Sequence, residues 1–459
     1  MLTPEAGMKL PLLSEVDILV AGGGTAGAIA GIAGARRTRR TLVVEQQGFL
    51  GGTQTGALVT PMMPNHLAGK PLNGGIDHEL NLRMNARGES GVWRDGNRGW
   101  FNPEALKVVL EEMAAESGTG LLYYTQCEDA ILDGDRLWGI VVLNKAGRSV
   151  IRAARTIDCT GDADIAFRAG VPCDAGEESS GITQPFSVRF HLGNVNLGRF
   201  ARFLRSLGRH EVMEEVEGSS VPLIHTAMVW GKGWTLEPLF RRAVEEGVLQ
   251  ESDGNYFQVF TMAGRPGELA FNCPRISSGI DGTNPFHLTA AQITGRAIVQ
   301  RYALFCRRYL PGCEESYVLM SAPMVGVRDS RRIRGEYRVT VDDVLSGAKF
   351  EDAVCRNNYP LDIHFERPRT GPTRVADGDY HEVPYRALVP LGVENLLVAG
   401  RCLSADFEAQ SSIRIQTNCR AMGEAAAVAA ALSLERDITP RALDGRLLRQ
   451  ALREQGGFL

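Results

Sequence analysis

Two apolar runs separated by a glycine-rich turn open the chain. Residues 16–21, "VDILVA", have the continuous apolar pattern of a buried strand, and residues 41–45, "TLVVE", have the same pattern. Between them, glycine and alanine dominate a stretch that predicts a helix through about Arg37. Two parallel strands joined by a helix form a βαβ unit. The pattern therefore predicts an α/β fold with a parallel sheet.

The pattern changes twice further along. Helices are predicted near 76–85 and over 102–117, where Asn102 is a suitable cap and Pro103 suits the first turn. Residues 121–133, 136–145 and 148–153 predict a β-meander, and 156–160 a separate short strand. The strand–helix alternation weakens from about 184 to 386. A buried-strand pattern returns at 388–400, and an alanine-rich helix is predicted over 412–432.

A chain of 459 residues is too long for one ordinary core. Because similar strand patterns flank the middle region, we predict a discontinuous first domain made of residues 14–185 and 387–440. This domain combines a parallel sheet with the β-meander. Residues 186–386 are predicted to form an α+β substrate or capping domain, and residues 441–459 a carboxyl-terminal helix or tail.

Composition and charge narrow the function classes. The net charge of −4 offers no general attraction for nucleic acid or anionic lipid. No stretch of about 20 apolar residues predicts a membrane span. The nine cysteines are scattered without a CxxC pair or a metal-like cluster, so we expect reduced thiols, no metal site and a cytoplasmic protein.

The glycine-rich turn has the spacing of a dinucleotide site. Gly22, Gly24 and Gly27 satisfy GxGxxG directly after a predicted strand and before a predicted helix. Glu45 ends the next strand, where an acidic side chain binds ribose hydroxyls in a Rossmann-like fold. Its charge disfavours a 2′-phosphate on that ribose. NAD and FAD both remain compatible with the turn alone.

Four further segments sharpen this interpretation. They are "TIDCTGDADIAFRAGVP" at 156–172, "GVRDSRRIRGEY" at 326–337, "NNYPLDIHF" at 357–365 and the segment 395–431 that ends in "MGEAAAVAAA". Together with the early "GFLGGT" at 48–53, they resemble the FAD-dependent oxidoreductase family. That family is placed in the glutathione-reductase superfamily and is related to fumarate-reductase-type flavoproteins. The resemblance implies FAD as the cofactor and a Rossmann-like FAD-binding domain.

The resemblance also implies which residues bind FAD. Glycines and an acid would hold its ADP half, a second glycine pair its pyrophosphate, and the late segments its ribityl chain and flavin ring. The residues so assigned are Gly22, Gly24, Thr25, Ala26, Gly27, Glu45, Gln46, Gly51, Gly52, Thr53, Cys127, Thr160, Gly161, Asp162, Gly400, Arg401, Ser412, Ile413 and Arg414. A helix beginning near Ser412 would point its positive end at the flavin.

Three residues are candidates for the reaction itself. His364 would exchange a proton beside flavin N5, although a lone histidine between apolar neighbours is also typical of a core. Arg328 and Arg332 would hold an anionic substrate, or else belong to a structural ion-pair network. We therefore predict a dehydrogenase or oxidase that transfers a hydride between a small polar substrate, carboxylated or hydroxylated, and flavin N5.

Two alternatives stay open. One is an FAD-dependent monooxygenase, although the sequence lacks the GADGxxSxxR motif that such enzymes usually show. The other is a flavin-carrying electron-transfer subunit. No second GxGxxG unit for a pyridine nucleotide is present in the sequence. The expected partner is a small-molecule substrate, while the electron acceptor and a homo-oligomeric state are left open.

Overall fold

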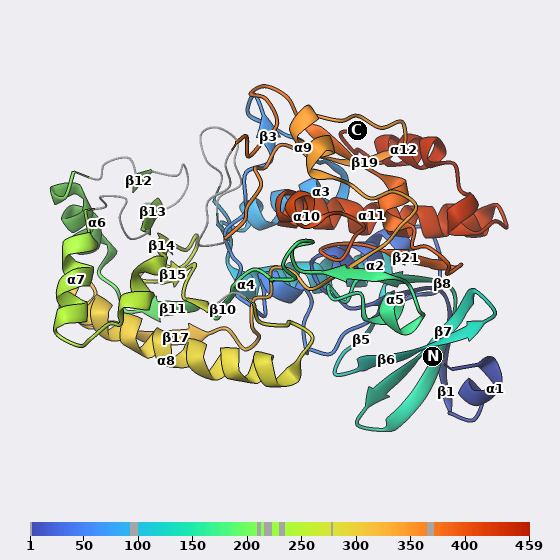
Figure 1. The fold of residues 1–459 in the computed structure, drawn as a ribbon, viewed down its shortest axis with the longest axis horizontal. Coiled ribbons are helices and arrows are strands. Elements are labelled where there is room, and N and C mark those ends of the chain that lie inside the picture. Colours follow the sequence, from blue (N-terminus) through green and yellow to red (C-terminus); the bar gives the residue numbers. More distant parts are fainter. Residues whose placement is uncertain are drawn as a thin grey trace.

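A parallel-rich sheet carries the first part of the molecule (Figure 1). The computed structural model describes residues 2–91, 100–208, 213–214, 223–228, 235–276, 279–364 and 371–459. Within them, seven strands follow the order β5-β2-β1-β8-β7-β6, with β21 also paired to β8. Their bounds are β1 Leu12–Ala21, β2 Thr41–Val44, β5 Gly120–Leu122, β6 Gln126–Asp133, β7 Arg136–Asn144, β8 Gly147–Asp158 and β21 Leu396–Val398.

The central strands run parallel and the meander lies at one edge. Strand β1 pairs in parallel with β2 and β8, β2 with β5, and β21 with β8. Strands β6 and β7 pair antiparallel, as do β7 and β8. The predicted α/β class, with a parallel sheet and a β-meander, is confirmed.

Two strand predictions need correction. The expected strand 121–133 is divided into β5 and β6, because Tyr124 between them adopts a left-handed conformation and the two pieces pair with different strands. The expected separate strands at 148–153 and 156–160 are one strand, β8. It does not break, because it pairs with β7 along its first half and with β1 along most of its length.

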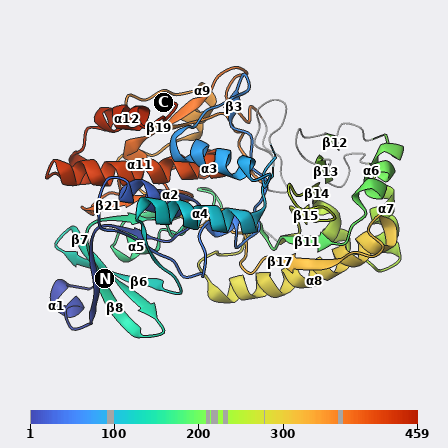
Figure 2. The same ribbon diagram turned by 180° about the vertical axis from the view of Figure 1, so that it is seen from behind.

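Four helices form a layer against this sheet (Figure 2). They are α2 Thr25–Ala35, α3 Gly75–Ala86, α4 Pro103–Ser117 and α11 Gln416–Glu435. Helix α4 begins as predicted, since the Asn102 side chain accepts a hydrogen bond from the Glu104 amide at 3.0 Å. Helices α2 and α11 lie close together, and Gly423 permits this. A β-carbon added at Gly423 would be only 2.1 Å from the carbonyl oxygen of Ala26.

The predicted single helix over 412–432 is wrong. Helix α10 covers Phe407–Ile413, and α11 begins only at Gln416. Ile415 between them has an extended conformation, with φ −62° and ψ 155°. The β-branched residues Ile413, Ile415 and Thr417 have lower helix propensity than the alanines that follow. The chain thus turns at 414–415 and gives α11 an amino terminus of its own.

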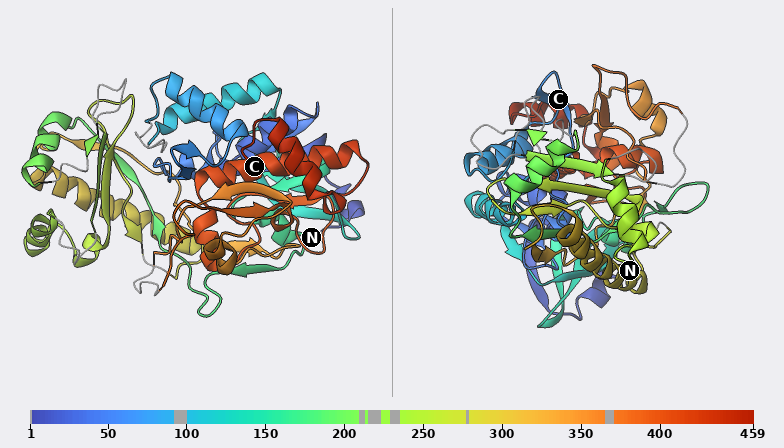
Figure 3. Two further views of the ribbon diagram at one scale, coloured as in Figure 1. Left: turned by 90° about the horizontal axis from the view of Figure 1, so that it is seen from above. Right: turned by 90° about the vertical axis from the view of Figure 1, so that its left-hand side faces the viewer.

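An antiparallel sheet forms the second part, at the other end of the molecule (Figure 3). Its order is β12-β13-β14-β15-β11-β17. The strands are β11 Phe190–Gly193, β12 Met213–Glu214, β13 Leu223–Met228, β14 Phe257–Thr261, β15 Leu269–Phe271 and β17 Tyr317–Ser321. Helices α6 Leu197–Ser206, α7 Glu237–Glu245 and α8 Pro285–Tyr309 accompany them. Aromatic side chains form its core, including stacked Phe190 and Phe271. This part has the predicted α+β character.

Smaller elements complete the described chain. The remaining helices are α1 Pro4–Gly7, α5 Asp164–Arg168, α9 Val341–Ser346 and α12 Gly445–Glu454. The remaining strands form four pairs: β3 His66–Leu67 with β4 Lys70–Pro71, β9 Cys173–Ala175 with β18 Arg331–Ile333, β10 Phe186–Ser187 with β16 Arg275–Ile276, and β19 Ala353–Asn357 with β20 His381–Pro384.

Residues well before 386 already pack with the first part of the molecule. Val339, Val354 and Val383 share one apolar cluster with Val20 of β1 and Ile29 of α2. The domain limits at 186 and 386 stay a prediction. None of the helices in the described ranges is both long and apolar enough to cross a membrane.

Candidate active site

A cavity of about 940 Å³ collects residues from both sheets. Its lining runs from Gly22, directly after β1, to Cys419 in the first turns of α11, and includes residues next to β11 and β14. The volume lies at the upper end of the range typical of small-molecule and cofactor sites. The predicted site residues can be placed relative to this cavity.

The glycine-rich turn has the geometry that a bound pyrophosphate needs. Gly22 has φ +92°, and a β-carbon there would be 2.7 Å from the Cys159 carbonyl oxygen. A β-carbon at Gly24 would meet no protein atom closer than 3.8 Å, and Gly24 lines the cavity. Thr25 and Ala26 line it as well, where α2 begins without a side-chain cap. The free amide groups at this helix end suit a phosphate.

Gly27 has another role. It does not line the cavity, and a β-carbon at this position would lie 1.8 Å from the Gly22 carbonyl oxygen. The third glycine thus allows α2 to lie close to the turn that follows β1.

Glu45 lies at the end where the adenosine ribose is expected. Its two carboxylate oxygens accept hydrogen bonds from the amides of Gly23 and Gln47, each at 2.8 Å. Burial raises the pKa of Glu45, while these amides act in the opposite direction. Both oxygens retain a lone pair for a hydroxyl group. Gln46 and Cys127, the latter near the start of β6, line the same cavity.

The second glycine pair approaches the first. Gly52 has φ +54°, and a β-carbon there would lie 2.7 Å from the α-carbon of Gly24. Gly52 and Thr53 line the cavity. Gly51 is not among the lining residues. It has a left-handed conformation, with φ +101°, and its amide donates a 2.9 Å hydrogen bond to the Gly23 carbonyl. This bond connects the second glycine pair to the first turn.

The loop after β8 joins a late segment of the chain. Thr160, Gly161 and Asp162 line the cavity, as do Gly400 and Arg401 after β21. The Arg401 guanidinium donates to Asp162 at 2.6 Å and to the Val327 carbonyl at 2.6 Å. Asp158, which the sequence analysis missed, shapes this loop by accepting hydrogen bonds from Thr160 and from the Ala166 amide.

The amino terminus of α11 faces the cavity. Arg414, Ile415, Gln416 and Cys419 line it. Ser412 and Ile413 do not, because they belong to α10, where the Ser412 hydroxyl donates to the Tyr359 carbonyl at 2.5 Å. A helix amino terminus carries partial positive charge. The expected positive helix end is therefore present, but it begins at Gln416 rather than near Ser412.

The cavity fits FAD on these observations. Its lining includes a glycine turn with space for a phosphate, an uncapped helix start, a buried acid with free lone pairs and a second helix amino terminus. The turn at Gly24 leaves the space that a side chain would otherwise fill. A dinucleotide with a planar ring system matches the polarity of this lining.

His364 lies in the cavity beside a carboxylate. Its Nε2 is 3.1 Å from Asp362 Oδ1, and Asp362 in turn pairs with Arg414 at 3.0 Å. Burial lowers the pKa of His364 to about 4, although Asp362 opposes this effect. Burial opposes the charged form of Asp362, but His364, Arg414 and Arg328 together hold its pKa below the ordinary value. At neutral pH the pair consists of a neutral imidazole and a carboxylate.

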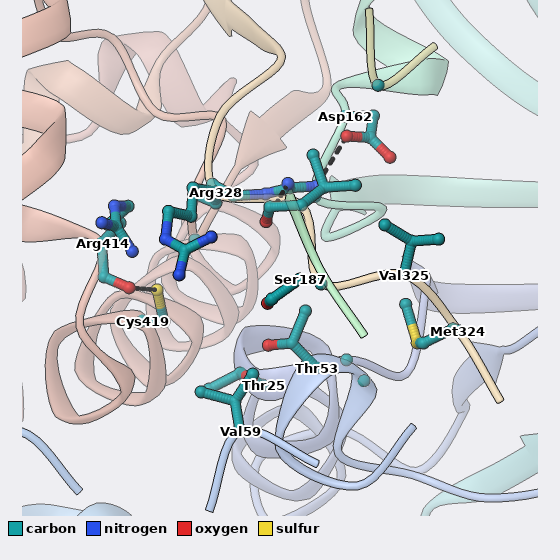
Figure 4. A pocket seen from close by; sticks show the side chains of 18 of the residues that line it. Thr25, Thr53, Val59, Asp162, Ser187, Met324, Val325, Arg328, Arg414 and Cys419 are labelled. Atoms are coloured by element: carbon teal, nitrogen blue, oxygen red, sulfur yellow. Dashed lines mark hydrogen bonds and ion pairs between the residues drawn. The ribbon is translucent and has the colours of Figure 1, made fainter. Parts of the chain in front are cut away.

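Only one of the two candidate arginines lines the cavity. Arg328 lines the cavity, and Figure 4 shows its guanidinium on the same side as Arg414 and Cys419, with Met324 and Val325 opposite. Arg332 is fully buried away from the cavity, where it donates to the carbonyls of Ala405 and Gly176. It lies in β18, whose pairing with β9 directs this side chain into the protein. The expectation that Arg332 contacts substrate is not met by this placement.

Sequence reasoning missed a set of polar residues that the antiparallel sheet and the segments next to it contribute to the cavity. The lining residues in this group are Arg189, Tyr256, Gln258, Asn272 and Arg275. They are scattered over a region where no motif was apparent. Only strand pairing brings them to one wall of the cavity.

Known proteins resemble this chain at several levels. A thiamine thiazole synthase from Methanococcus vannielii is 31% identical over 165 residues, which cover 33% of this chain and 59% of that enzyme. The chain thus matches less than two thirds of that relative's length.

Two solved structures are similar to this chain at low identity. A geranylgeranyl bacteriochlorophyll reductase-like protein from Thermoplasma acidophilum has a TM-score of 0.46 and 12% identity, covering 96% of this chain and 84% of that one. The p-nitrophenol 4-monooxygenase from Pseudomonas putida DLL-E4 has a TM-score of 0.47 and 10% identity, covering 93% and 81%.

The family comparison covers nearly the whole chain. The model of the FAD dependent oxidoreductases matches residues 17–452, a span that contains the glycine-rich turn, the loop after β8 and α11. The match agrees with the cavity that these segments line. The chain therefore belongs to the FAD dependent oxidoreductase family, and its cofactor is FAD.

Proposed function

We propose that this enzyme is a dehydrogenase or oxidase that oxidises or reduces a small anionic substrate directly at the flavin. The observation that supports it most is the Asp362–His364 pair, which lines the cavity together with Arg328 and Arg414. When bound, FAD supplies an N5 atom that exchanges a hydride with a substrate C–H. We also keep the wider glutathione-reductase superfamily as a prediction.

His364 is the proposed proton acceptor in substrate oxidation. Because Asp362 is ionised and can only accept hydrogen bonds, the His364 nitrogen that faces it carries the proton. The lone pair of Nδ1 is then available to a substrate hydroxyl or amine. Asp362 keeps the ring oriented and stabilises the imidazolium that forms. In the reverse direction the same group returns the proton.

Arg328 and Arg414 are proposed to position the anionic end of the substrate. Arg328 Nη1 donates a hydrogen bond to the Pro185 carbonyl, and Arg414 Nη2 donates to Asp362. A guanidinium presents a planar pair of donors to a carboxylate. Together with the positive end of α11, these groups also favour negative charge near the reacting centre.

The test is anaerobic reduction of the FAD-loaded protein by a library of small hydroxy acids, amino acids and alcohols. We expect some anionic members to bleach the flavin absorbance. His364→Gln should slow that reduction by about 10²- to 10⁴-fold, since general base catalysis contributes this much. The control is His287→Gln, a change in an exposed histidine of α8 that does not line the cavity.

Two outcomes would contradict the proposal. If no library member reduces the flavin while NADH or NADPH does, and oxygen then yields a hydroxylated product, the enzyme is a monooxygenase. If His287→Gln slows the reduction as much as His364→Gln, the assigned base is wrong.

A further inference from the structure

An unpaired buried guanidinium lines the wall of the cavity contributed by the antiparallel sheet. We infer that the cavity takes a substrate with two separated anionic groups, and that Arg189 and Arg275 bind the second of them. The inference rests on the proposed function, in which Arg328 and Arg414 bind the first group. It assigns a recognition role to residues outside every motif of the sequence.

Arg189 carries the inference. It precedes β11, lines the cavity and is 7% exposed. Its Nε and Nη1 atoms are buried and have no hydrogen-bond partner among the described residues. A buried charge without a partner is costly, so such groups are normally paired. These two nitrogens are covered by protein, so an anion in the cavity would meet the remaining part of the guanidinium and would supply the missing countercharge.

Arg275 lies on the same wall. Its guanidinium stacks on the Tyr256 ring at 3.6 Å from the ring centroid, and its Nε also lacks a hydrogen-bond partner among the described residues. Stacking leaves the edge of a guanidinium available for a carboxylate. Asn272 contributes a further polar group, anchored to the Tyr256 hydroxyl at 3.2 Å.

Positive charges outnumber negative charges near this wall of the cavity. Arg189, Arg275, Arg328 and Arg414 line the cavity, and burial together with the first two and Arg414 lowers the pKa of Arg328. Guanidinium groups nevertheless remain protonated in proteins. In the described lining, the only acid that interacts with these arginines at hydrogen-bond distance is Asp362.

The other acids of the lining are engaged elsewhere. Glu45 lies at the ribose end, Asp162 pairs with Arg401, and Asp164 pairs with Arg331. One carboxylate on the substrate would therefore leave two of the four guanidinium groups without a countercharge. A doubly charged anion would leave only one of them without a countercharge, so it matches the charge of this lining better than a singly charged anion does.

The arginines come from different parts of the fold. Arg414 directly precedes α11, whereas Arg189 precedes β11 and Arg275 belongs to β16. A single carboxylate has two oxygens, which one pair of guanidinium groups is enough to occupy. A molecule with two anionic groups joined by a short carbon chain can reach both, with the carbon to be oxidised or reduced between them.

The experiment is a binding titration of the FAD-loaded protein, followed by the change in flavin absorbance. The probes are succinate and glutarate as dianions, butyrate as a matched monoanion, and inorganic phosphate as a compact anion. We expect at least one dicarboxylate to bind about tenfold or more tightly than butyrate and phosphate. Arg189→Gln and, separately, Arg275→Gln should weaken dicarboxylate binding by about 10- to 100-fold and leave butyrate binding nearly unchanged.

A control and a stability measurement separate recognition from a structural role. Arg199→Gln removes an exposed arginine of α6 that pairs with Glu314, and it should leave all four affinities unchanged. Without added anions, Arg189→Gln should unfold at the same temperature as the wild type or higher, because it removes an unpaired buried charge. A lower unfolding temperature would indicate a structural role and overturn the inference.

Other outcomes also overturn it. The inference is wrong if butyrate or phosphate binds as tightly as both dicarboxylates, or if both glutamine variants retain wild-type affinity. Its failure is distinguishable from that of the proposed function. Dicarboxylate binding that depends on Arg189, in an enzyme that no substrate reduces, would leave this inference standing and refute the dehydrogenase proposal.

Discussion

At the scale of single residues, the Asp362–His364 pair determines the expected pH dependence. Burial lowers the pKa of His364 to about 4, whereas an unperturbed histidine titrates near 6.5. The neutral ring is the form that accepts a proton. We therefore expect kcat/KM for substrate oxidation to rise as the pH rises through about 4 and to be level by about pH 6. Stopped-flow flavin reduction across this range checks it, and an acidic limb centred near 6.5 would contradict it.

Asp362 acts on the reaction through His364 and is a positioning residue. Asp362 raises the pKa of His364, against the effect of burial. In Asp362→Asn we expect the acidic limb to move to lower pH, and kcat to fall by about 10²-fold because the imidazolium loses its countercharge. The Asp377→Asn variant, in an exposed residue that does not line the cavity, is the control. An unchanged limb would refute the coupling.

At the scale of elements, the contact between α2 and α11 holds the two ends of the cofactor site together. The start of α2, at Thr25 and Ala26, and the start of α11, at Gln416 and Cys419, both line the cavity. Their close approach depends on Gly423, because a β-carbon there would meet the backbone of Ala26 at 2.1 to 3.0 Å. Backbone atoms cannot yield as a flexible side chain can.

We therefore expect Gly423→Ala to destabilise the protein by about 1 to 3 kcal/mol and to weaken FAD binding. The alanine gains helix propensity of about 1 kcal/mol, which is smaller than this clash. Gly198→Ala in α6 is the matched control, since its β-carbon would meet atoms no closer than 3.7 Å. Denaturant unfolding checks the pair, and equal stability of the two variants would refute the role of the contact.

At the scale of the whole molecule, FAD connects segments that are distant in the sequence. The cavity lining includes residues near β1, the loop after β8, the segment after β21 and the start of α11. A ligand that binds only the folded state stabilises it, by about 2.7 kcal/mol at one hundred times its Kd. We expect this gain in the free energy of unfolding when FAD is added to the cofactor-free protein.

Gly24→Ala should abolish most of that gain without changing the stability of the cofactor-free protein. The added β-carbon has room among the protein atoms, at 3.8 Å from its nearest neighbours, but it lies where the pyrophosphate approaches. Thermal unfolding with and without FAD measures both effects. A variant that keeps the full gain would show that the turn does not hold the phosphates.

Local patterns predicted the parts of the fold that depend on local interactions. The glycine turn, the strands on either side of it and the cap at Asn102 lie in short segments, and the structure has them close to the predicted bounds. The helix break at 414–415 was missed, because no glycine or proline marks it in the sequence. The single strand β8 was missed because its continuity depends on its pairing with β1 and β7.

The candidate site likewise has features that the sequence predicted and features that only the tertiary structure shows. By itself, the sequence determined the dinucleotide turn, the acid at Glu45 and the family, since these depend on residues that are neighbours along the chain. Only the tertiary structure decided that Arg332 points into the protein, that Asp162 meets Arg401, and that Arg189 and Arg275 line the cavity. The physical reason is that burial, charge pairing and strand register arise from contacts between residues far apart in the sequence, which no local pattern records.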